Sequence, residues 1–182
     1  IVAVGMKGGT EVVAQSVANS TQAGDIATLS MKAGDAVVSP ANNKGYMKGN
    51  MKAAGKNIDG AYVDMFGDQI QDRVQAKMQA LYDGDMPLGE AFVIRTYPEG
   101  TPIPVGKPGW LVVSPTVTYQ ESGMPPKATP DLAGKAMTNV LKAVGDAGID
   151  RVFMPAMGMG STVGAKNMQN DFRKEFQNAY DV

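Results

Sequence analysis

Apolar residues along the chain fall into two kinds of pattern that alternate from one end to the other. Short runs rich in valine, isoleucine and aromatic residues are typical of strands, and stripes that repeat every three or four residues are typical of helices. The run Asp35–Ser39 has consecutive apolar residues at its centre, which favours a strand buried on both faces. Together the short runs predict six strands, at Ile1–Val4, Gln22–Ala27, Asp35–Ser39, Ala91–Thr96, Trp110–Ser114 and Arg151–Met154.

Two long helices are predicted between these strands. Apolar residues recur every four positions from about Asn57 to Leu81, and Asp83-Gly84-Asp85 ends this stripe. Thr129-Pro130-Asp131 combines a capping hydroxyl, a proline suited to the first helical turn and an early acid, so it predicts a helix start. That second helix extends to about Ala147 and stops at Gly148.

The remaining segments predict shorter elements and loops. Thr10–Ala18 predicts a weak helix after the glycine turn Gly5–Gly9, and Met168–Tyr180 predicts a final amphipathic helix. Irregular connections are expected at Gly45–Lys56, Pro98–Gly109 and Glu121–Thr129, which are rich in glycine, lysine or proline. The alternation of strands and helices predicts one α/β domain over residues 1–182 with a largely parallel sheet.

Composition narrows the classes of function. The chain has 182 residues, of which 43% are hydrophobic and 19% charged, as in soluble globular proteins. The formal net charge of -1 gives no reason to expect nucleic acid or an anionic membrane as a partner. No apolar run approaches the roughly 20 residues that span a bilayer, and nothing resembles a signal peptide, so a cytoplasmic protein is expected.

The absence of cysteine and histidine limits the possible chemistry most strongly. Without cysteine there are no disulfides, thiolate nucleophiles or cysteine-bearing zinc sites. Without histidine there is no Ser-His-Asp arrangement and no imidazole base. Catalysis would therefore rely on carboxylates, lysine, tyrosine, asparagine, backbone amides, bound water or a hard metal held by oxygen ligands. We expect no metal site and no resident cofactor.

Two strand ends carry candidate binding groups. The strand Asp35–Ser39 is stopped by Pro40 and followed directly by Asn42 and Asn43, as at the carboxyl edge of an open α/β sheet. The strand Arg151–Met154 is followed by the glycine loop Gly158–Gly164, which precedes a helix. Such a loop suits phosphate binding, although no P-loop lysine follows. Taken alone, the asparagine segment favours a plain strand and turn, and the glycine loop is as compatible with a flexible connection as with phosphate binding.

Several of these segments, taken in order, resemble the macro domain family. The matching segments are Gly24-Asp25-Ile26, Asp35 through Asn43, and Pro155 through Gly164. Ser39 stands where the family usually has the first asparagine of Asn-x-Ala-Asn. Gly45-Tyr46-Met47, Met86 through Ala91, and Ser114 through Val117 look closer to a bacterial and phage-type branch. The resemblance implies a three-layer α/β/α sandwich around a central mixed, largely parallel six-stranded sheet, with ADP-ribose as the ligand.

The family's residues carry over position by position. Asp25 would accept a hydrogen bond from the adenine amino group, Asn42 would contact the distal ribose, and Gly158–Gly164 would cradle the diphosphate and that ribose. Tyr180 would flank the adenine unless it is only a core residue of its helix. The ligand-binding residues implied are Gly24, Asp25, Ile26, Ala41, Asn42, Asn43, Gly49, Gly55, Asn57, Ile58, Pro115, Thr116, Gly158, Met159, Gly160, Ser161, Thr162, Val163 and Gly164.

The first glycine loop of the family has two candidate positions in this chain. One is Gly45 through Met51, and the other is Gly55 through Ala61, which resembles the family's Gly-Gly-Gly-Val-Asp-Gly-Ala. We prefer the second as the helix start, so that Lys48–Ala54 becomes an insertion beside the ligand.

Some macro domains hydrolyse ADP-ribosyl bonds or ADP-ribose 1″-phosphate, and others only bind. Hydrolysis here would use a water oriented by Asn42 and activated by a ligand phosphate or by Asp59, with Lys48 or Lys56 in an electrostatic role. One alternative is a non-catalytic sensor or sequestering module for another nucleotide-derived signal. A less favoured alternative is an NAD-dependent Rossmann enzyme that uses the Gly5–Gly9 loop.

Overall fold

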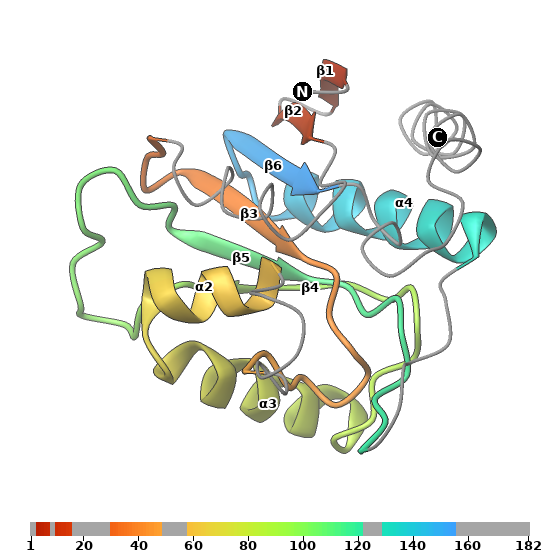
Figure 1. The fold of residues 1–182 in the computed structure, drawn as a ribbon. Helices are drawn as coiled ribbons and strands as arrows, with labels where there is room; N and C mark the ends of the chain where they lie inside the picture. The colour runs from red at the N-terminus through yellow and green to blue at the C-terminus, as the bar shows by residue number, and fades with distance from the viewer. Residues whose placement is uncertain (1–2, 8–9, 16–29, 49–57, 122–128, 156–182) are drawn as a thin grey trace.

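A mixed β-sheet forms the centre of the computed structural model, which describes residues 3–7, 10–15, 30–48, 58–121 and 129–155 (Figure 1). Its strand order is β1-β2-β6-β3-β5-β4. The inner pairs β2–β6, β6–β3 and β3–β5 are parallel, and the outer pairs β1–β2 and β5–β4 are antiparallel. The strands are β1 (Ala3–Lys7), β2 (Thr10–Gln15), β3 (Asp35–Ser39), β4 (Phe92–Arg95), β5 (Trp110–Val113) and β6 (Arg151–Pro155).

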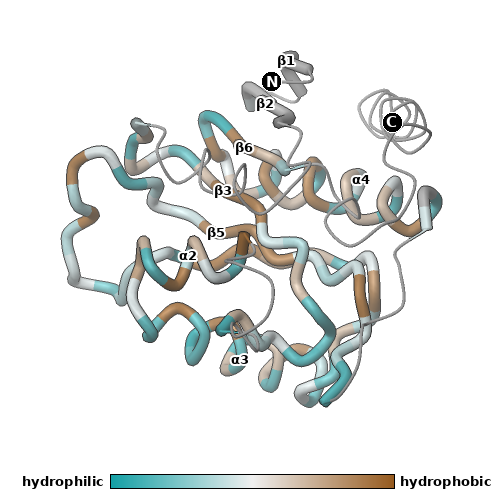
Figure 2. The backbone as a smooth tube through the Cα atoms, viewed as in Figure 1, coloured by the Kyte–Doolittle hydropathy of each residue, from teal (hydrophilic) through white to brown (hydrophobic). Residues whose placement is uncertain are grey.

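Helices cover both faces of this sheet and give the predicted three layers. Helices α2 (Ile58–Phe66) and α3 (Gln69–Tyr82) pack on one face, and α4 (Pro130–Asp146) packs on the other (Figure 1). Successive residues of β3 show why both faces are apolar. Val37 packs with α2 and α3, whereas Ala36 and Val38 pack with α4. Figure 2 shows the resulting hydrophobic centre along β3 and β5.

The prediction for α4 is confirmed at its start and within one residue at its end. Thr129 has an extended backbone and its hydroxyl accepts a hydrogen bond from Leu132 N at 3.2 Å, with Pro130 in the first turn. Four predicted strands are also confirmed within one or two residues, namely β3, β4, β5 and β6. The proline-rich segment 98–109 forms no helix or strand, as expected.

The single helix predicted over Asn57–Leu81 is wrong, because the segment forms two helices. α2 ends at Phe66 and α3 begins at Gln69, and Gly67 between them has a φ of +82°. Glycine adopts this left-handed conformation without steric cost, so it lets the chain turn between the helices. The apolar stripe still identifies the buried face, since Phe66 and Ile70 on either side of the break are both buried. α2 begins at Ile58, in the segment preferred for the helix start.

The weak helix predicted over Thr10–Ala18 is also wrong. Residues Thr10–Gln15 form strand β2, which pairs with β1 in an antiparallel register that places Lys7 opposite Thr10. A dinucleotide-binding loop joins a strand to a helix N-terminus, whereas the chain here turns from one strand into the next. This hairpin removes the structural basis for a Rossmann enzyme built on Gly5–Gly9. Strand β1 ends at Lys7, three residues beyond the predicted end at Val4, and the first two predicted residues lie outside the described part of the chain.

An ion pair joins two central strands at the edge opposite their carboxyl ends. Asp35 of β3 lies opposite Arg151 of β6, and the guanidinium donates to both carboxylate oxygens, at 3.0 Å and 2.6 Å. The Asp35 side chain is only 2% exposed. Because removal of Arg151 would leave the buried Asp35 carboxylate without its opposite charge, this pair fixes β3 against β6.

Some predictions fall outside the described residues. They are the strand at Gln22–Ala27, the final helix at Met168–Tyr180, and most of the loops at Gly45–Lys56 and Glu121–Thr129. Among the helices that are described, none is both long and apolar enough to cross a membrane. The described part of the chain also holds no cluster of three or more acidic side chains placed to bind a metal ion.

Candidate functional site

The carboxyl ends of β3 and β5 continue side by side into two loops. Ser114 N donates to Ser39 O, Thr116 N to Ala41 O, and Asn43 N to Val117 O, at 3.0 Å, 3.0 Å and 3.2 Å. The loops therefore extend the parallel ladder beyond the strands and form a fixed edge. Open α/β sheets bind ligands at this edge, so it is the candidate site.

A buried carboxyl group lies where β3 ends and α2 begins. Asp59 is the second residue of α2 and is 6% exposed. The Ser39 hydroxyl donates to its Oδ1 at 2.5 Å and is the carboxyl group's one hydrogen-bond partner among the described residues. Burial raises the pKa of Asp59 from its usual 3.8 to about 6, although the Ser39 hydrogen bond favours the charged form and lowers it.

Tyr62, one turn further along α2, helps to fix the position of Asp59 relative to β3. The Tyr62 hydroxyl is fully buried and donates to Val38 O at 2.8 Å, which ties α2 to β3. Burial, together with the negative charge of Asp59, raises the pKa of Tyr62 well above its usual value. Tyr62 therefore stays neutral, and Asp59 is the group at this position that can exchange a proton near neutral pH.

Asn42 closes the loop that follows β3. Its amide nitrogen donates to Tyr46 O at 2.8 Å, and its Oδ1 accepts from Lys44 N at 3.0 Å and from Tyr46 N at 3.2 Å. The carboxamide predicted to contact a ribose thus holds residues 42–46 in a tight turn.

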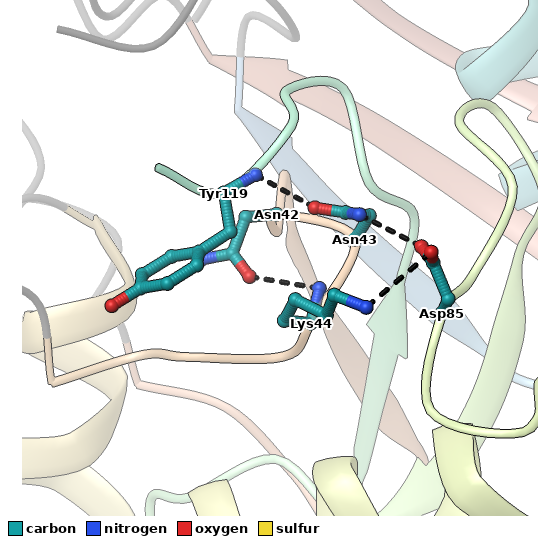
Figure 3. A network of polar contacts seen from close by, with 5 residues as sticks. All are labelled: Asn42, Asn43, Lys44, Asp85 and Tyr119. Carbon is teal, nitrogen blue, oxygen red and sulfur yellow. Dashed lines mark hydrogen bonds and ion pairs between the residues drawn. The ribbon is translucent and has the colours of Figure 1, made fainter. Parts of the chain in front are cut away.

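Asn43 joins three loops (Figure 3). Its amide nitrogen donates to Asp85 Oδ1 at 2.7 Å, and its Oδ1 accepts from Tyr119 N at 2.7 Å. Its backbone carbonyl accepts from Met86 N at 3.0 Å. Lys44 also contacts Asp85, at 3.3 Å, and the hydrogen bond from Asn43 and the ammonium group of Lys44 lower the pKa of Asp85. Asn43 therefore fixes the relative positions of the loops after β3, α3 and β5.

The same two loops bring together Tyr46 and Tyr119. Their ring centroids are 4.5 Å apart with 35° between the planes, and both side chains remain exposed. The Tyr46 loop is held against α3 by Gln71, whose Oε1 accepts from Met47 N and Lys48 N. Lys48 in turn lies 3.3 Å from Asp68.

The other predicted ligand-binding residues within the described part contribute mainly backbone. Ala41 and Thr116 are buried and bonded to each other through the main chain. Pro115 O accepts from Gly89 N at 2.8 Å, and Ile58 is half-buried at the start of α2. The predicted residues outside the described part are Gly24, Asp25, Ile26, Gly49, Gly55, Lys56, Asn57, Tyr180 and the whole of Gly158–Gly164.

Sequence reasoning missed the partnership of Ser39 with Asp59 and the meeting of Tyr46 with Tyr119. The sequence spacing of neither pair predicts a contact, because the two residues of each pair belong to different elements that are far apart in the sequence. A signal did exist for the tyrosines, since an aromatic residue in a polar loop is unusual enough to suggest a role in binding. A third feature was also missed: Ser114 Oγ is buried at the end of β5 without a hydrogen-bond partner in the described structure.

Comparison with known proteins identifies similar chains. The family model described as Macro domain matches residues 38–167. Among solved structures, the macrodomain of Mycobacterium tuberculosis DarG shares 17% identity with a TM-score of 0.58, covering 95% of this chain and 94% of that one. The macrodomain of Thermus aquaticus DarG shares 15% identity with a TM-score of 0.58, covering 94% and 92%. A search of curated proteins finds no significant match. At these identities the structural likeness shows the fold.

Proposed function

Because this chain belongs to the macro domain family, we propose that it binds ADP-ribose or a related ADP-ribosyl metabolite at the carboxyl edge of its sheet. The observation that carries the proposal is the family match over residues 38–167, a range that includes the edge formed after β3 and β5. The geometry supports it, since that edge is held by main-chain bonds, and Ser39, at the end of β3, donates to the buried carboxyl group of Asp59.

Each part of the proposed ligand has an expected position. Asp25 binds the adenine and Gly158–Gly164 binds the diphosphate, as the resemblance implies. Asp59 lies toward the distal ribose, at the start of α2. Asn42 contributes to binding of the distal ribose in one of two ways. Its side chain replaces one of its hydrogen bonds within the loop by a hydrogen bond to a ribose hydroxyl, or it holds the turn that it closes in the shape that the ribose requires.

Calorimetric titration with ADP-ribose tests the binding proposal. We expect roughly micromolar affinity, weaker binding of AMP, and loss of binding in Asp25→Ala because the adenine amino group loses its acceptor. Asn42→Ala should weaken binding by removing either the ribose contact or the turn. Lys77→Ala, an exposed change on α3, is the control and should bind normally. Absence of heat with ADP-ribose, in protein shown to be folded, would contradict the proposal.

We further propose that the site hydrolyses an ADP-ribosyl bond, and the observation that favours this is the state of Asp59. A carboxyl group with a pKa of about 6 is present in both protonation forms near neutral pH. Asp59 takes a proton from a water whose oxygen bonds to the C1″ carbon of the distal ribose. The bond from C1″ to the leaving group breaks, and the leaving group keeps the electron pair and is protonated from solvent.

Phosphate release from ADP-ribose 1″-phosphate, measured from about pH 4.5 to about pH 8.5, tests this second proposal. The rate should rise with an apparent pKa of about 6, because the base acts in its ionised form. Asp59→Asn should reduce the rate by roughly a hundredfold or more while ADP-ribose still binds. Ser39→Ala should move the rise to higher pH, since the hydrogen bond that lowers the pKa of Asp59 is lost. Binding without turnover in the wild type would identify a binding module instead.

A further inference from the structure

Tyr46 and Tyr119 form a pair of exposed rings at the carboxyl edge of the sheet. Their side chains are 44% and 37% exposed, and the rings touch with centroids 4.5 Å apart. The other exposed large hydrophobic residues in the described structure, Leu81 and Val105, have no such aromatic partner. Two tyrosines that meet from separate loops and still face solvent are not explained by core packing.

The backbone of each tyrosine is fixed by one of two adjacent asparagines. Asn42 bonds to both the N–H and the carbonyl of Tyr46, and Asn43 accepts from the N–H of Tyr119. Figure 3 shows Asn43 between Tyr119 and Asp85, with Lys44 reaching the same carboxylate. The asparagine pair that follows β3 therefore positions the two aromatic residues.

A prepositioned aromatic pair is suited to bind a flat ring. Tyrosine faces stack on planar rings, and a side chain with two rotatable angles loses little entropy when its backbone is already fixed. Stacking on aromatic residues is a main source of affinity for bases and similar rings. Both tyrosine loops begin beside Ser39, which bonds to Asp59, so the rings lie on the same edge as the proposed reactive group.

We propose that Tyr46 and Tyr119 form an aromatic surface that stacks a planar ring carried by the ligand of this edge. The proposal rests on the proposed binding of an ADP-ribosyl group. In this proposal, Tyr46 and Tyr119 determine which chemical group attached to the ADP-ribosyl unit binds best. Both residues lie outside the buried Ser39–Asp59 pair.

Titration with ADP-ribose and with NAD tests the surface, because NAD is the same ADP-ribosyl group with a nicotinamide ring on its distal ribose. The wild type should bind NAD roughly tenfold more tightly than ADP-ribose. Tyr46→Ala and Tyr119→Ala should each lower the NAD affinity toward that of ADP-ribose and leave ADP-ribose binding unchanged. Tyr46→Phe should keep the preference, because the phenyl ring retains its face.

Leu81→Ala, another exposed apolar change, is the matched control and should keep the preference. Thermal unfolding checks each variant, and Tyr119→Leu, which keeps apolar volume without an aromatic face, replaces the alanine variant if that one does not fold. Equal affinities of the wild type for the two ligands, or a preference that survives in the alanine and leucine variants, would overturn the aromatic surface alone. No binding of either ligand would overturn the proposed function and this inference with it.

Discussion

At the scale of single residues, Asp59 shows how position alone changes a side chain's chemistry. The carboxyl group is buried at the start of α2, where the helix N-terminus and the Ser39 hydroxyl favour its charge and burial opposes it. Burial dominates, so the pKa rises to about 6. The raised pKa suits Asp59 for proton transfer, but it also means that ionisation of Asp59 lowers the stability of the folded protein.

The stability of the protein should therefore fall as the pH rises through the range in which Asp59 ionises. The folded state holds the proton more tightly than the unfolded state, so the contribution is present below pH 3.8 and lost above about pH 6. That pKa difference corresponds to about 3 kcal/mol at most. Asp59→Asn should raise the free energy of unfolding by up to this amount at about pH 7.5 and change little at about pH 4.

Urea unfolding at the two pH values measures this effect. The exposed Asp72→Asn on α3 is the control and should give no gain at high pH. Equal stability of Asp59→Asn and the wild type at about pH 7.5 would contradict the account.

At the scale of elements, the loop after β3 depends on its close approach to α3. Gly45 has a φ of +73°, and a Cβ built there would lie 3.0 Å from Met78 Sδ and 3.1 Å from Val74 Cγ1. Both neighbours are buried and have little room to move. The loop that carries Tyr46 thus rests on the helix because one residue has no side chain.

Gly45→Ala should destabilise the protein more than a matched change elsewhere. Gly100 also has a left-handed backbone, with a φ of +82°, but a Cβ there meets nothing within 4 Å. Both variants should lose about 1 kcal/mol from backbone strain, and Gly45→Ala should lose roughly 1 kcal/mol more from crowding against α3. Chemical denaturation compares the two directly. Equal losses would show that the loop can lift from α3 without cost.

Helices and strands were predictable from the sequence where one local pattern was strong. Predictions were wrong where a single residue, or pairing with a distant strand, overrode the local pattern. The apolar stripe locates the buried faces of α2 and α3, but the stripe continues across Gly67, whose left-handed backbone separates the two helices. The helix predicted from Thr10 failed because residues 10–15 pair with β1 and β6, and pairing between strands overrides a weak local propensity.

At the scale of the whole molecule, two-sided burial of the inner strands leaves the carboxyl edge of the sheet as the candidate site. Helices on both faces leave the strand ends as the place where polar groups reach solvent. The ion pair of Asp35 with Arg151 holds β3 and β6 together at the opposite edge.

The sequence by itself determined the α/β class and the strand end that carries Asn42, because strand and helix periodicity are local properties, and its resemblance to the macro domain family implied the three layers. Only the tertiary structure decided what the residues at this edge touch. Asn42 closes a turn, Asn43 joins three loops, Ser39 bonds to Asp59, and Tyr46 meets Tyr119. These contacts link residues from different elements, and their partners are chosen by packing of the whole chain, which no local pattern records.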